Sequence, residues 1–354
     1  MLNIKGLSVK LPGFVLYDIN LQVDTGEFFA IIGPTGSGKS LLLEAVMGLL
    51  PGNTISSTGQ IFLKDREITH LPPHKRGIGI LYQDVALFPH MTVEENIRYG
   101  IRYHRIDKQR VEELFSFLTD RFGIRHLLKR YPVRISGGER QRVALCRVLI
   151  LNPKVLLLDE PLSALDPLFQ QEIRQLLRQL HKELGITFVI VSHNFEEVMY
   201  LAKKGAVIQK GQIVQQGQIE EIFNRPASSS VARFVGATNV FKVHKKDGCT
   251  KVGAFPIILD DKAKYSSFTH ISIRPERIVA GVDRLNDGLP ENIFEGNVVE
   301  MSRQSFNVSL RLERSDGILF HAIWPEYLVR SLGIGLGGSV RFGFFKGDVG
   351  TFKE

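Results

Sequence analysis

The chain is poor in cysteine and tryptophan, and it lacks a long hydrophobic run. Its 354 residues include two cysteines and one tryptophan. Cys146 and Cys249 lie far apart, which excludes a disulfide framework and a cysteine-rich metal cluster, and we expect both as small buried side chains. No segment approaches the roughly 18 apolar residues of a membrane-spanning helix. Residues 1–10 alternate like a strand and lack the apolar core of a signal peptide, so we expect a cytosolic protein.

The chain also lacks a concentrated basic tract. Its formal net charge of +8 is spread over several short stretches without interleaved aromatic residues, which argues against a nucleic-acid partner. The apolar fraction of 44% and the charged fraction of 23% are ordinary for a globular protein. The length is sufficient for two domains, each with its own core.

Short apolar runs alternate with helical patterns as far as about residue 234. Val155–Leu158 is wholly apolar and Thr187–Val191 is apolar after its first residue, which is typical of strands covered on both faces of a parallel sheet. Glu27–Ile32 is expected as a strand and Ser40–Leu50 as a buried helix, whereas Lys108–Leu118 has the three- and four-residue spacing of an amphipathic helix. We therefore predict an α/β domain over residues 1–235 with a helical insert at about 88–151.

The composition changes after residue 224. Short alternating runs are separated by the turn pairs Asp247-Gly248, Asp287-Gly288 and Asp316-Gly317. This pattern predicts a C-terminal all-β, barrel-like domain over residues 236–354.

A glycine-rich segment joins the expected strand at 27–32 to the following helix. The segment reads Gly33, Pro34, Thr35, Gly36, Ser37, Gly38, Lys39 and Ser40. In this context backbone N–H groups and the helix start bind the phosphates of a nucleotide. We therefore predict that the α/β domain is a P-loop NTPase core. Lys39 is expected to contact the β- and γ-phosphates, and the Ser40 hydroxyl to bind Mg²⁺.

Polar side chains follow three of the apolar strands. Asp159 and Glu160 end the strand at 155–158, and we expect Asp159 to hold Mg²⁺ and Glu160 to act as general base toward the attacking water. Gln83 follows the strand at 78–82 and is expected to reach Mg²⁺ or the water. His193 follows the strand at 187–191, where its imidazole is expected to contact the γ-phosphate.

A second phosphate-binding helix start lies at Ser136, Gly137, Gly138 and Glu139. Ser136 and Glu139 fit a capping box, which would give them a purely structural role. Two glycines at a helix start weaken the helix, and they favour a site where the backbone closely approaches a ligand. One chain has no second nucleotide for this site.

These motifs, in this order and spacing over residues 1 to about 235, resemble the ATPase subunit of an ABC transporter. The resemblance implies ATP and Mg²⁺ as cofactors and a homodimer in which Ser136–Glu139 of one subunit binds the γ-phosphate held by the other. It also implies that Ser163, Ala164, Leu165 and Asp166 lie along the dimer seam. Residues 83–92 would receive a transmembrane permease subunit, and Phe14, with Tyr17 behind it, would stack on adenine.

The region after residue 235 resembles the accessory β-domain of importer ATPases, with Ile273–Glu276 as its Arg-Pro-Glu element. The segments 33–44 and 71–79 resemble those of molybdate/tungstate importers. The resemblance thus implies an ATP hydrolase that energises uptake of such an oxyanion, peripheral at the cytoplasmic face of the cell membrane and served by an extracytoplasmic binding protein. An importer for iron, sulfate, polyamine or sugar is one alternative, and a soluble, non-transport ABC ATPase is another.

Overall fold

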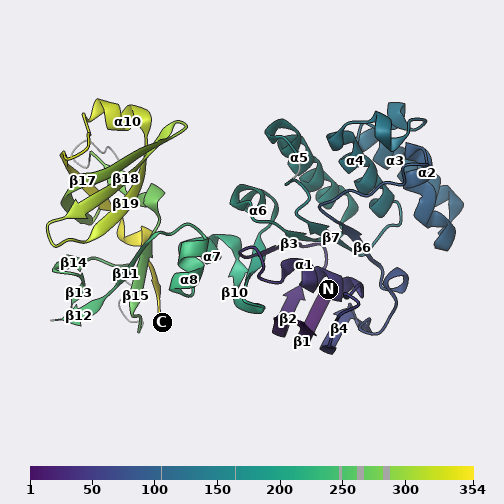
Figure 1. Cartoon of the computed structure of the whole chain (residues 1–354), viewed down its shortest axis with the longest axis horizontal. Helices are drawn as coiled ribbons and strands as arrows, with labels where there is room; N and C mark the ends of the chain where they lie inside the picture. Colours follow the sequence, from purple (N-terminus) through teal and green to yellow (C-terminus); the bar gives the residue numbers. More distant parts are fainter. Residues whose placement is uncertain (105, 164, 247–248, 261–266, 282–287) are drawn as a thin grey trace. The chain divides into compact units, whose positions relative to one another are not determined.

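The computed structural model of the chain describes residues 1–104, 106–163, 165–246, 249–260, 267–281 and 288–354 (Figure 1). The chain divides into two compact units, Met1–Ile219 and Glu220–Glu354. This division falls before the expected boundary at residue 235, because α8 (Ser229–Phe234) packs with the second unit. Ala232 of α8 shares an apolar cluster with Ala237 and Phe352.

A mixed six-stranded sheet, in the order β10-β9-β3-β8-β7-β6, forms the centre of the first unit. Its strands are β3 (Phe28–Ile32), β6 (Ile78–Leu81), β7 (Val155–Asp159), β8 (Thr187–Val191), β9 (Lys204–Gln209) and β10 (Gln212–Gln218). All neighbours are parallel except β10, which pairs antiparallel with β9. Every residue of β3, β7 and β8 is buried, as the apolar runs predict. The carboxyl ends of these parallel strands therefore meet at one edge of the sheet.

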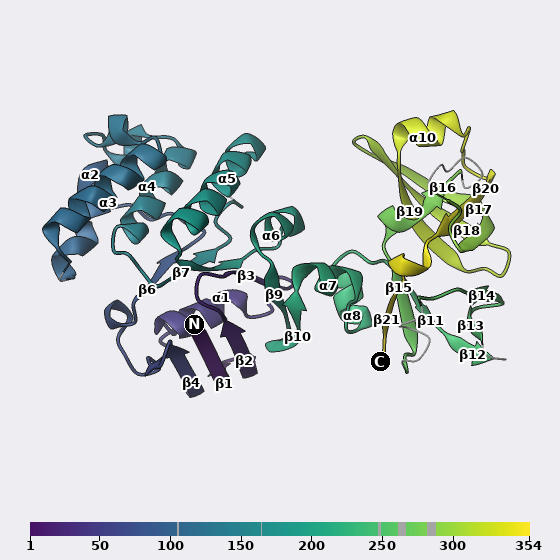
Figure 2. The ribbon, with the colours of Figure 1, turned by 180° about the vertical axis from the view of Figure 1, so that it is seen from behind.

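A second, antiparallel sheet has the order β2-β1-β4-β5. Its strands are β1 (Leu2–Leu11), β2 (Phe14–Val23), β4 (Ser56–Leu63) and β5 (Arg66–Glu67). Helix α1 (Lys39–Met47) shares one apolar core with both sheets. It lies on one face of the six-stranded sheet, and α5 (Pro167–Leu184) and α6 (Phe195–Leu201) lie on the other (Figures 1 and 2).

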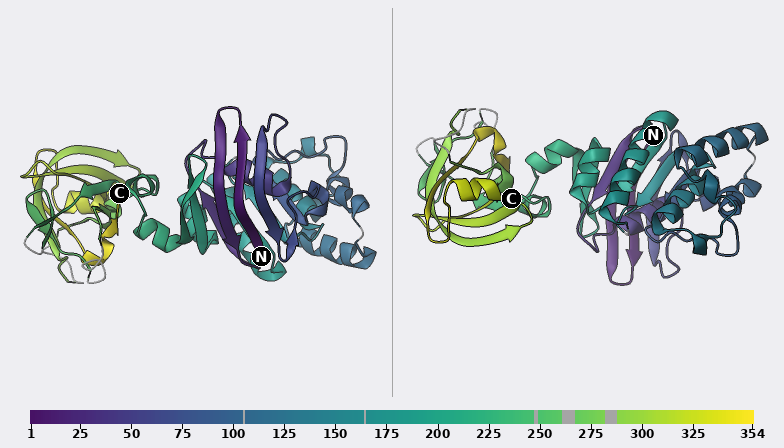
Figure 3. Two further views of the ribbon diagram at one scale, coloured as in Figure 1. Left: turned by 90° about the horizontal axis from the view of Figure 1, so that it is seen from below. Right: turned by 90° about the horizontal axis from the view of Figure 1, so that it is seen from above.

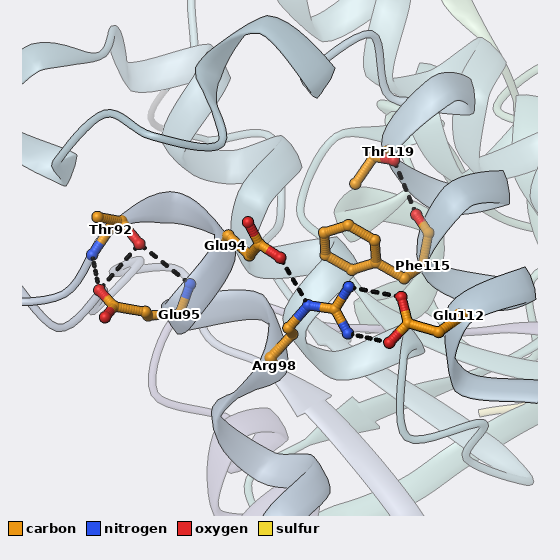
Figure 4. Close-up of polar contacts among 7 residues, drawn as sticks. All are labelled: Thr92, Glu94, Glu95, Arg98, Glu112, Phe115 and Thr119. Carbon is orange, nitrogen blue, oxygen red and sulfur yellow. Dashed lines mark hydrogen bonds and ion pairs between the residues drawn. The ribbon is translucent and has the colours of Figure 1, made fainter. Parts of the chain in front are cut away.

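The expected helical insert contains α2 (Val93–Arg98), α3 (Lys108–Arg121) and α4 (Gly137–Leu149). Arg98 joins α2 to α3, since its guanidinium donates to both oxygens of Glu112 at 2.5 and 2.7 Å and lies 3.9 Å from the centre of the Phe115 ring (Figure 4). A capping box between Thr92 and Glu95 begins α2. None of the described helices is both long and apolar enough to cross a membrane.

The second unit consists mainly of antiparallel strands that curl around one apolar core, green to yellow in Figure 3. Its three sheets have the orders β11-β15-β21, β12-β13-β14 and β16-β20-β17-β18-β19. The strands are β11 (Asn239–Lys242), β12 (His244–Lys246), β13 (Cys249–Val252), β14 (Phe255–Ile257), β15 (His270–Ile273), β16 (Val279–Ala280), β17 (Asn292–Gln304), β18 (Asn307–Arg314), β19 (Leu319–Pro325), β20 (Ser339–Phe344) and β21 (Gly350–Phe352). Short helices α7 (Ile219–Asn224), α8 and α10 (Glu326–Ser331) accompany them.

Two sequence expectations, on the cysteines and on the turn pairs, have mixed outcomes. Cys146 is buried in α4 as expected, but Cys249 is exposed because it begins β13 at the surface, so that expectation was wrong. Asp316-Gly317 forms the expected turn between β18 and β19, with Gly317 at φ 78°. Residues 247, 248 and 287 of the other two turn pairs lie outside the described residues.

Candidate functional site

The loop from Gly33 to Gly38 connects β3 to α1, as the sequence predicts. The Lys39 ammonium folds back over this loop and donates to the backbone oxygens of Gly33 at 2.8 Å and Pro34 at 3.0 Å. Burial lowers the pKa of Lys39, while Glu160 and Asp159 act in the opposite direction. A phosphate that enters the loop would therefore replace weak carbonyl contacts with charged ones.

Three glycines of this loop are required by the chain's own geometry. Gly36 and Gly38 have φ angles of 76° and 100°, which other residues rarely adopt. A Cβ atom at Gly33 would lie 2.1 Å from the Ile208 carbonyl oxygen. These residues thus explain the open, amide-rich shape of the loop without any ligand.

Phe14, the proposed adenine contact, lies against the same loop. A Cβ atom at Gly38 would be 2.8 Å from Cζ of the Phe14 ring, and the ring is partly buried on the core of the first unit. Tyr17 is 60% exposed on the same strand, β2. Both aromatic side chains remain predictions for the base contact.

Asp159 ends β7 as a buried carboxylate with one unsatisfied oxygen. It is 8% exposed, and its Oδ1 atom has no hydrogen-bond partner. Burial raises its pKa, the hydrogen bond from Ser40 lowers it, and the negative charge of Glu160 raises it. The orphaned oxygen beside a serine hydroxyl fits Mg²⁺, which prefers oxygen ligands and commonly takes only one or two protein carboxylates. Accordingly, the described residues contain no cluster of three His, Cys, Asp or Glu side chains able to hold a metal.

Gln83 lies two residues beyond the end of β6 and is exposed. The register pairs Leu81 of β6 with Leu158 of β7, so the chain leaves β6 beside Asp159. The structure therefore places Gln83 at the edge of the sheet that carries the two carboxylates.

Glu160 and His193 come from different strand ends and meet. The Glu160 N–H donates to the Val191 carbonyl oxygen at 2.9 Å, which ties the end of β7 to the end of β8. Its φ of 44° turns the side chain out of the strand direction. Nδ1 of His193 lies 3.1 Å from Oε2 of Glu160. A carboxylate and an imidazole in contact at this edge can accept and retain a proton from a water molecule.

Ser136 begins α4, and both halves of the capping box are formed. The Ser136 hydroxyl accepts from the Glu139 N–H at 3.2 Å, and Glu139 accepts from the Ser136 N–H at 2.7 Å. The hydrogen bond from the Ser136 N–H to the charged carboxylate lowers the pKa of Glu139. The structural role of both side chains is therefore present in the single chain.

The two glycines of this helix start differ from each other. A Cβ atom at Gly138 would lie 2.9 Å from the Phe169 ring, so packing within the chain explains this glycine. At Gly137 a Cβ atom would meet no atom closer than 3.9 Å, and its φ is not left-handed. Of the two glycines, only Gly137 is not required by packing or backbone conformation within the chain. Gly137 is therefore the glycine that favours close approach of a ligand.

The segment from Ser163 to Asp166 connects the carboxylates to α5. The Ser163 hydroxyl donates to the Glu160 carbonyl oxygen at 2.9 Å, and Asp166 caps α5 by accepting from the Phe169 N–H at 3.2 Å. Ala164 lies outside the described residues. Because Phe169 also contacts Gly138, α5 links the strand-end carboxylates to the start of α4.

Two further polar residues near the site escaped the sequence reasoning. Gln141 of α4 is buried and donates to the Pro161 carbonyl oxygen at 2.6 Å. Glu197 of α6 is 3% exposed and accepts a hydrogen bond from Ser192. Their only sequence signal is a polar residue on an otherwise apolar helix face, which is weak because most such residues are exposed.

Several known proteins are similar to this chain in sequence and in fold. The family described as "ABC transporter" matches residues 16–163. The molybdate/tungstate import ATP-binding protein WtpC of Thermococcus kodakarensis is 38% identical over 84% of this chain and 88% of its own length. WtpC of Pyrococcus abyssi is 33% identical over 99% of this chain and its own full length.

Other relatives carry different cargo names. An Fe(3+) ions and a spermidine/putrescine import ATP-binding protein of Fusobacterium nucleatum match at 37% and 36% identity, each over 78% of this chain. A sulfate/thiosulfate import ATP-binding protein of Agrobacterium fabrum matches at 42% over 67% of this chain.

Among solved structures, a dimeric ATP-binding cassette in a post-hydrolysis state, bound to ADP and Pi, is 26% identical with a TM-score of 0.54. It covers 62% of this chain and 99% of its own. The chain therefore belongs to the ATP-binding proteins of ABC transporters and is an ATPase that couples hydrolysis to transport.

Proposed function

We propose that this chain is the ATP-hydrolysing subunit of a membrane importer, with its nucleotide site at the carboxyl ends of β3, β7 and β8. The observation that carries the proposal is the meeting of the Lys39 loop, Asp159 and the Glu160–His193 pair at one edge of the sheet. Amides of residues 33–40 and the Lys39 ammonium bind the β- and γ-phosphates. Phe14 packs beside the loop, where an adenine ring would stack.

Mg²⁺, when bound, would neutralise charge on the β- and γ-phosphates. Asp159 and Ser40 would hold it, with Gln83 at the neighbouring strand end. Glu160 orients the attacking water and accepts its proton, and His193 contacts both Glu160 and the γ-phosphate. Burial of Asp159 and Lys39 strengthens these charge interactions because little water screens them.

The second half of the nucleotide site comes from a second copy of the chain. Within one chain, no hydrogen bond or ion pair among the described residues connects Ser136–Glu139 with the 33–40 loop. The open side of Gly137 accepts the γ-phosphate held by the partner subunit. The neighbour described as dimeric and bound to ADP and Pi supports a dimer, for which we propose a head-to-tail arrangement of two copies of this chain.

The segment from 83 to 92 would receive the permease. Asn96 holds this segment in place, since its side chain exchanges hydrogen bonds with the Phe88 backbone at 2.8 and 3.1 Å. Arg147 of α4 donates to the Ala86 carbonyl oxygen at 2.8 Å. A structural neighbour, CbiO1 of Clostridium perfringens, is part of the ABC transporter complex cbiONQ, which supports membrane subunits as partners. This assembly would place the chain at the cytoplasmic face of the membrane.

The proposed cargo is molybdate or tungstate, delivered by an extracytoplasmic binding protein. Two Pyrococcus WtpC proteins align over 99% of this chain, so their similarity includes the second unit. The iron, polyamine and sulfate relatives align over 67 to 84%. Purification of the permease with its binding protein, followed by titration with candidate solutes, tests the cargo. Binding of ferric ion, sulfate, a polyamine or a sugar in place of molybdate or tungstate would overturn it.

Glu160→Gln tests the nucleotide site. The neutral amide cannot accept the proton of water, so hydrolysis is lost while ATP binding and the closed dimer persist. Size-exclusion chromatography at high protein concentration should show a dimer of this variant with Mg-ATP and a monomer without nucleotide. Lys39→Ala is the control, because it should lose both ATP binding and dimerisation. A Glu160→Gln variant that stays monomeric at saturating Mg-ATP contradicts the proposed dimer with ATP bound between two chains.

A further inference from the structure

A short turn, Ser192-His193-Asn194, carries His193 from β8 to α6. The turn contains no residue with a left-handed φ, and its shape depends on hydrogen bonds. The Asn194 N–H donates to the Ser192 hydroxyl oxygen at 3.0 Å, and the Asn194 side chain accepts from the Glu197 N–H at 3.2 Å. The position of the exposed His193 ring is therefore set by its two neighbours.

Glu197 lies directly beneath this turn. It is 3% exposed, and its Oε2 atom accepts a hydrogen bond from the Ser192 hydroxyl. Its other oxygen, Oε1, has no partner. A buried carboxyl group with an unsatisfied oxygen lowers stability, so packing alone does not account for a glutamate here.

The hydrogen bond fixes the direction of the Ser192 hydroxyl. A hydroxyl has one hydrogen and two lone pairs. Because its hydrogen points to Glu197, a lone pair remains free for the Asn194 N–H. Removal of the Glu197 acceptor frees the hydroxyl to rotate and weakens the contact that shapes the turn beside His193.

The charged neighbours of Glu197 come from three elements. Arg174 lies on α5, Glu160 follows β7, and His193 precedes α6. Arg174 also forms an ion pair with the exposed Glu196, with Nη1 of Arg174 3.9 Å from Oε2 of Glu196. The hydrogen bond from Ser192 directs Glu197 at the turn. Ser192 directly precedes His193, which contacts Glu160, and this connects Glu197 to the site.

We propose that Glu197 is a positioning residue for ATP hydrolysis, which holds the Ser192-His193-Asn194 turn so that His193 meets Glu160 and the γ-phosphate. The inference rests on the role proposed for His193. Glu197 touches neither nucleotide nor water and acts through the turn. It affects the rate of hydrolysis and leaves the phosphate-binding loop unchanged.

Steady-state ATPase measurements on Glu197→Ala and Glu197→Gln test the inference. The alanine variant is expected to lower kcat by about 10- to 100-fold, since small misplacements of catalytic groups have effects of this size. KM for ATP should change less than about twofold, because the Lys39 loop is intact. The glutamine amide oxygen still accepts from Ser192, so Glu197→Gln should retain kcat within about threefold. Equal losses in both variants, or a loss confined to KM, would overturn the inference.

Glu196→Ala is the matched control, because Glu196 is the adjacent, 86% exposed glutamate of the same helix. Glu196→Ala should retain both kcat and KM for ATP. If Glu197→Ala does not fold, Ser192→Ala serves as the test, because it removes the donor of the same hydrogen bond. It should reproduce the loss of kcat, and an unchanged kcat would overturn the inference.

A double-mutant cycle with His193→Ala separates positioning from general damage. If Glu197 acts through His193, the double variant is no slower than His193→Ala alone. A further drop of tenfold or more in the double variant overturns the inference. If His193→Ala itself keeps full activity, the role proposed for His193 fails. If His193→Ala is slow but Glu197→Ala is fully active, the role of His193 stands and only the inference about Glu197 is overturned.

Discussion

At the scale of single residues, the two glycines at the start of α4 make a sharp comparison. Gly138→Ala places a Cβ atom 2.9 Å from the Phe169 ring, whereas Gly137→Ala points into open space. We expect Gly138→Ala to lower the free energy of unfolding by about 1–2 kcal/mol, and Gly137→Ala to leave it unchanged or slightly higher. Urea denaturation of the nucleotide-free variants measures both.

The effects of these two substitutions on ATPase activity should have the opposite order to their effects on stability. Gly137→Ala narrows the approach of the partner's γ-phosphate and should reduce ATPase activity and Mg-ATP-dependent dimerisation more than its stability. If Gly137→Ala remains fully active, the helix start has only its capping role.

Glu197 predicts a pH dependence of stability. Burial, the largest cause, raises its pKa from 4.5 to about 7. The native chain thus holds a proton between these pH values that the unfolded chain releases, so stability falls as pH rises from 4.5 to 7 and is level above. Glu197→Gln should remove this fall, which amounts to at most about 3 kcal/mol. Denaturation monitored by circular dichroism at pH 5 and pH 8, in both proteins, measures the difference. A fall of equal size in the variant contradicts the prediction.

At the scale of elements, an ion pair between a buried arginine and a half-buried aspartate connects turns of the second unit. Arg314, at the end of β18, donates to both oxygens of Asp316 at 2.8 and 2.7 Å and to the Val252 carbonyl oxygen at 2.6 Å. Asp316 in turn accepts from the Ala254 N–H at 3.0 Å. The pair therefore connects the β18–β19 turn to the hairpin of β13 and β14.

Asp316→Asn should destabilise this unit. The hydrogen bond from Arg314 lowers the Asp316 pKa from 3.8 to about 2, so the pair's contribution is present above pH 4 and is lost as pH falls through 2. At pH 7 the substitution should cost about 2 kcal/mol. The single tryptophan, Trp324, is buried in β19 and reports this unit by fluorescence during denaturation. Glu313→Gln, an exposed neighbour on β18, is the control. An equal midpoint for both variants would contradict the role of the pair.

Strand and helix positions followed from local pattern where burial is uniform. Thr187–Val191 was predicted with its observed bounds, because four apolar residues in succession after Thr187 are typical of a strand buried on both faces. Helix α3 extends to Arg121, three residues beyond its apolar pattern, since a helix end depends on capping and packing more than on periodicity. The apolar pattern of α8 did not show that it packs on β-strands of the second unit.

At the scale of the whole molecule, the proposed homodimer places each nucleotide between two chains. Lys39→Ala inactivates the phosphate loop, and Gly137→Trp blocks the helix start of α4. Neither variant alone should hydrolyse ATP. In a mixed dimer, one site contains both defects and the other contains neither.

Mixing the two inactive variants should therefore restore hydrolysis. With random exchange, about a quarter of all sites are intact. ATPase activity of the mixture, against each variant at the same total concentration, is the measurement. No recovery, under conditions in which fluorescence energy transfer shows subunit exchange, would place both motifs in the same site of one chain.

The candidate nucleotide site could be predicted along the chain because each of its motifs is local. The residues from Gly33 to Ser40 need only the strand before them and the helix after them, and Ser136 with Glu139 forms a cap within one turn. Contacts between segments that are distant in the sequence could be seen only in the folded chain. The Glu160–His193 meeting, the packing of Gly138 on Phe169 and the support of His193 by Glu197 arise from parallel strand pairing and from helices packed over the sheet. A pattern with a period of two or 3.6 residues specifies which side of an element is buried, but not which neighbour covers it.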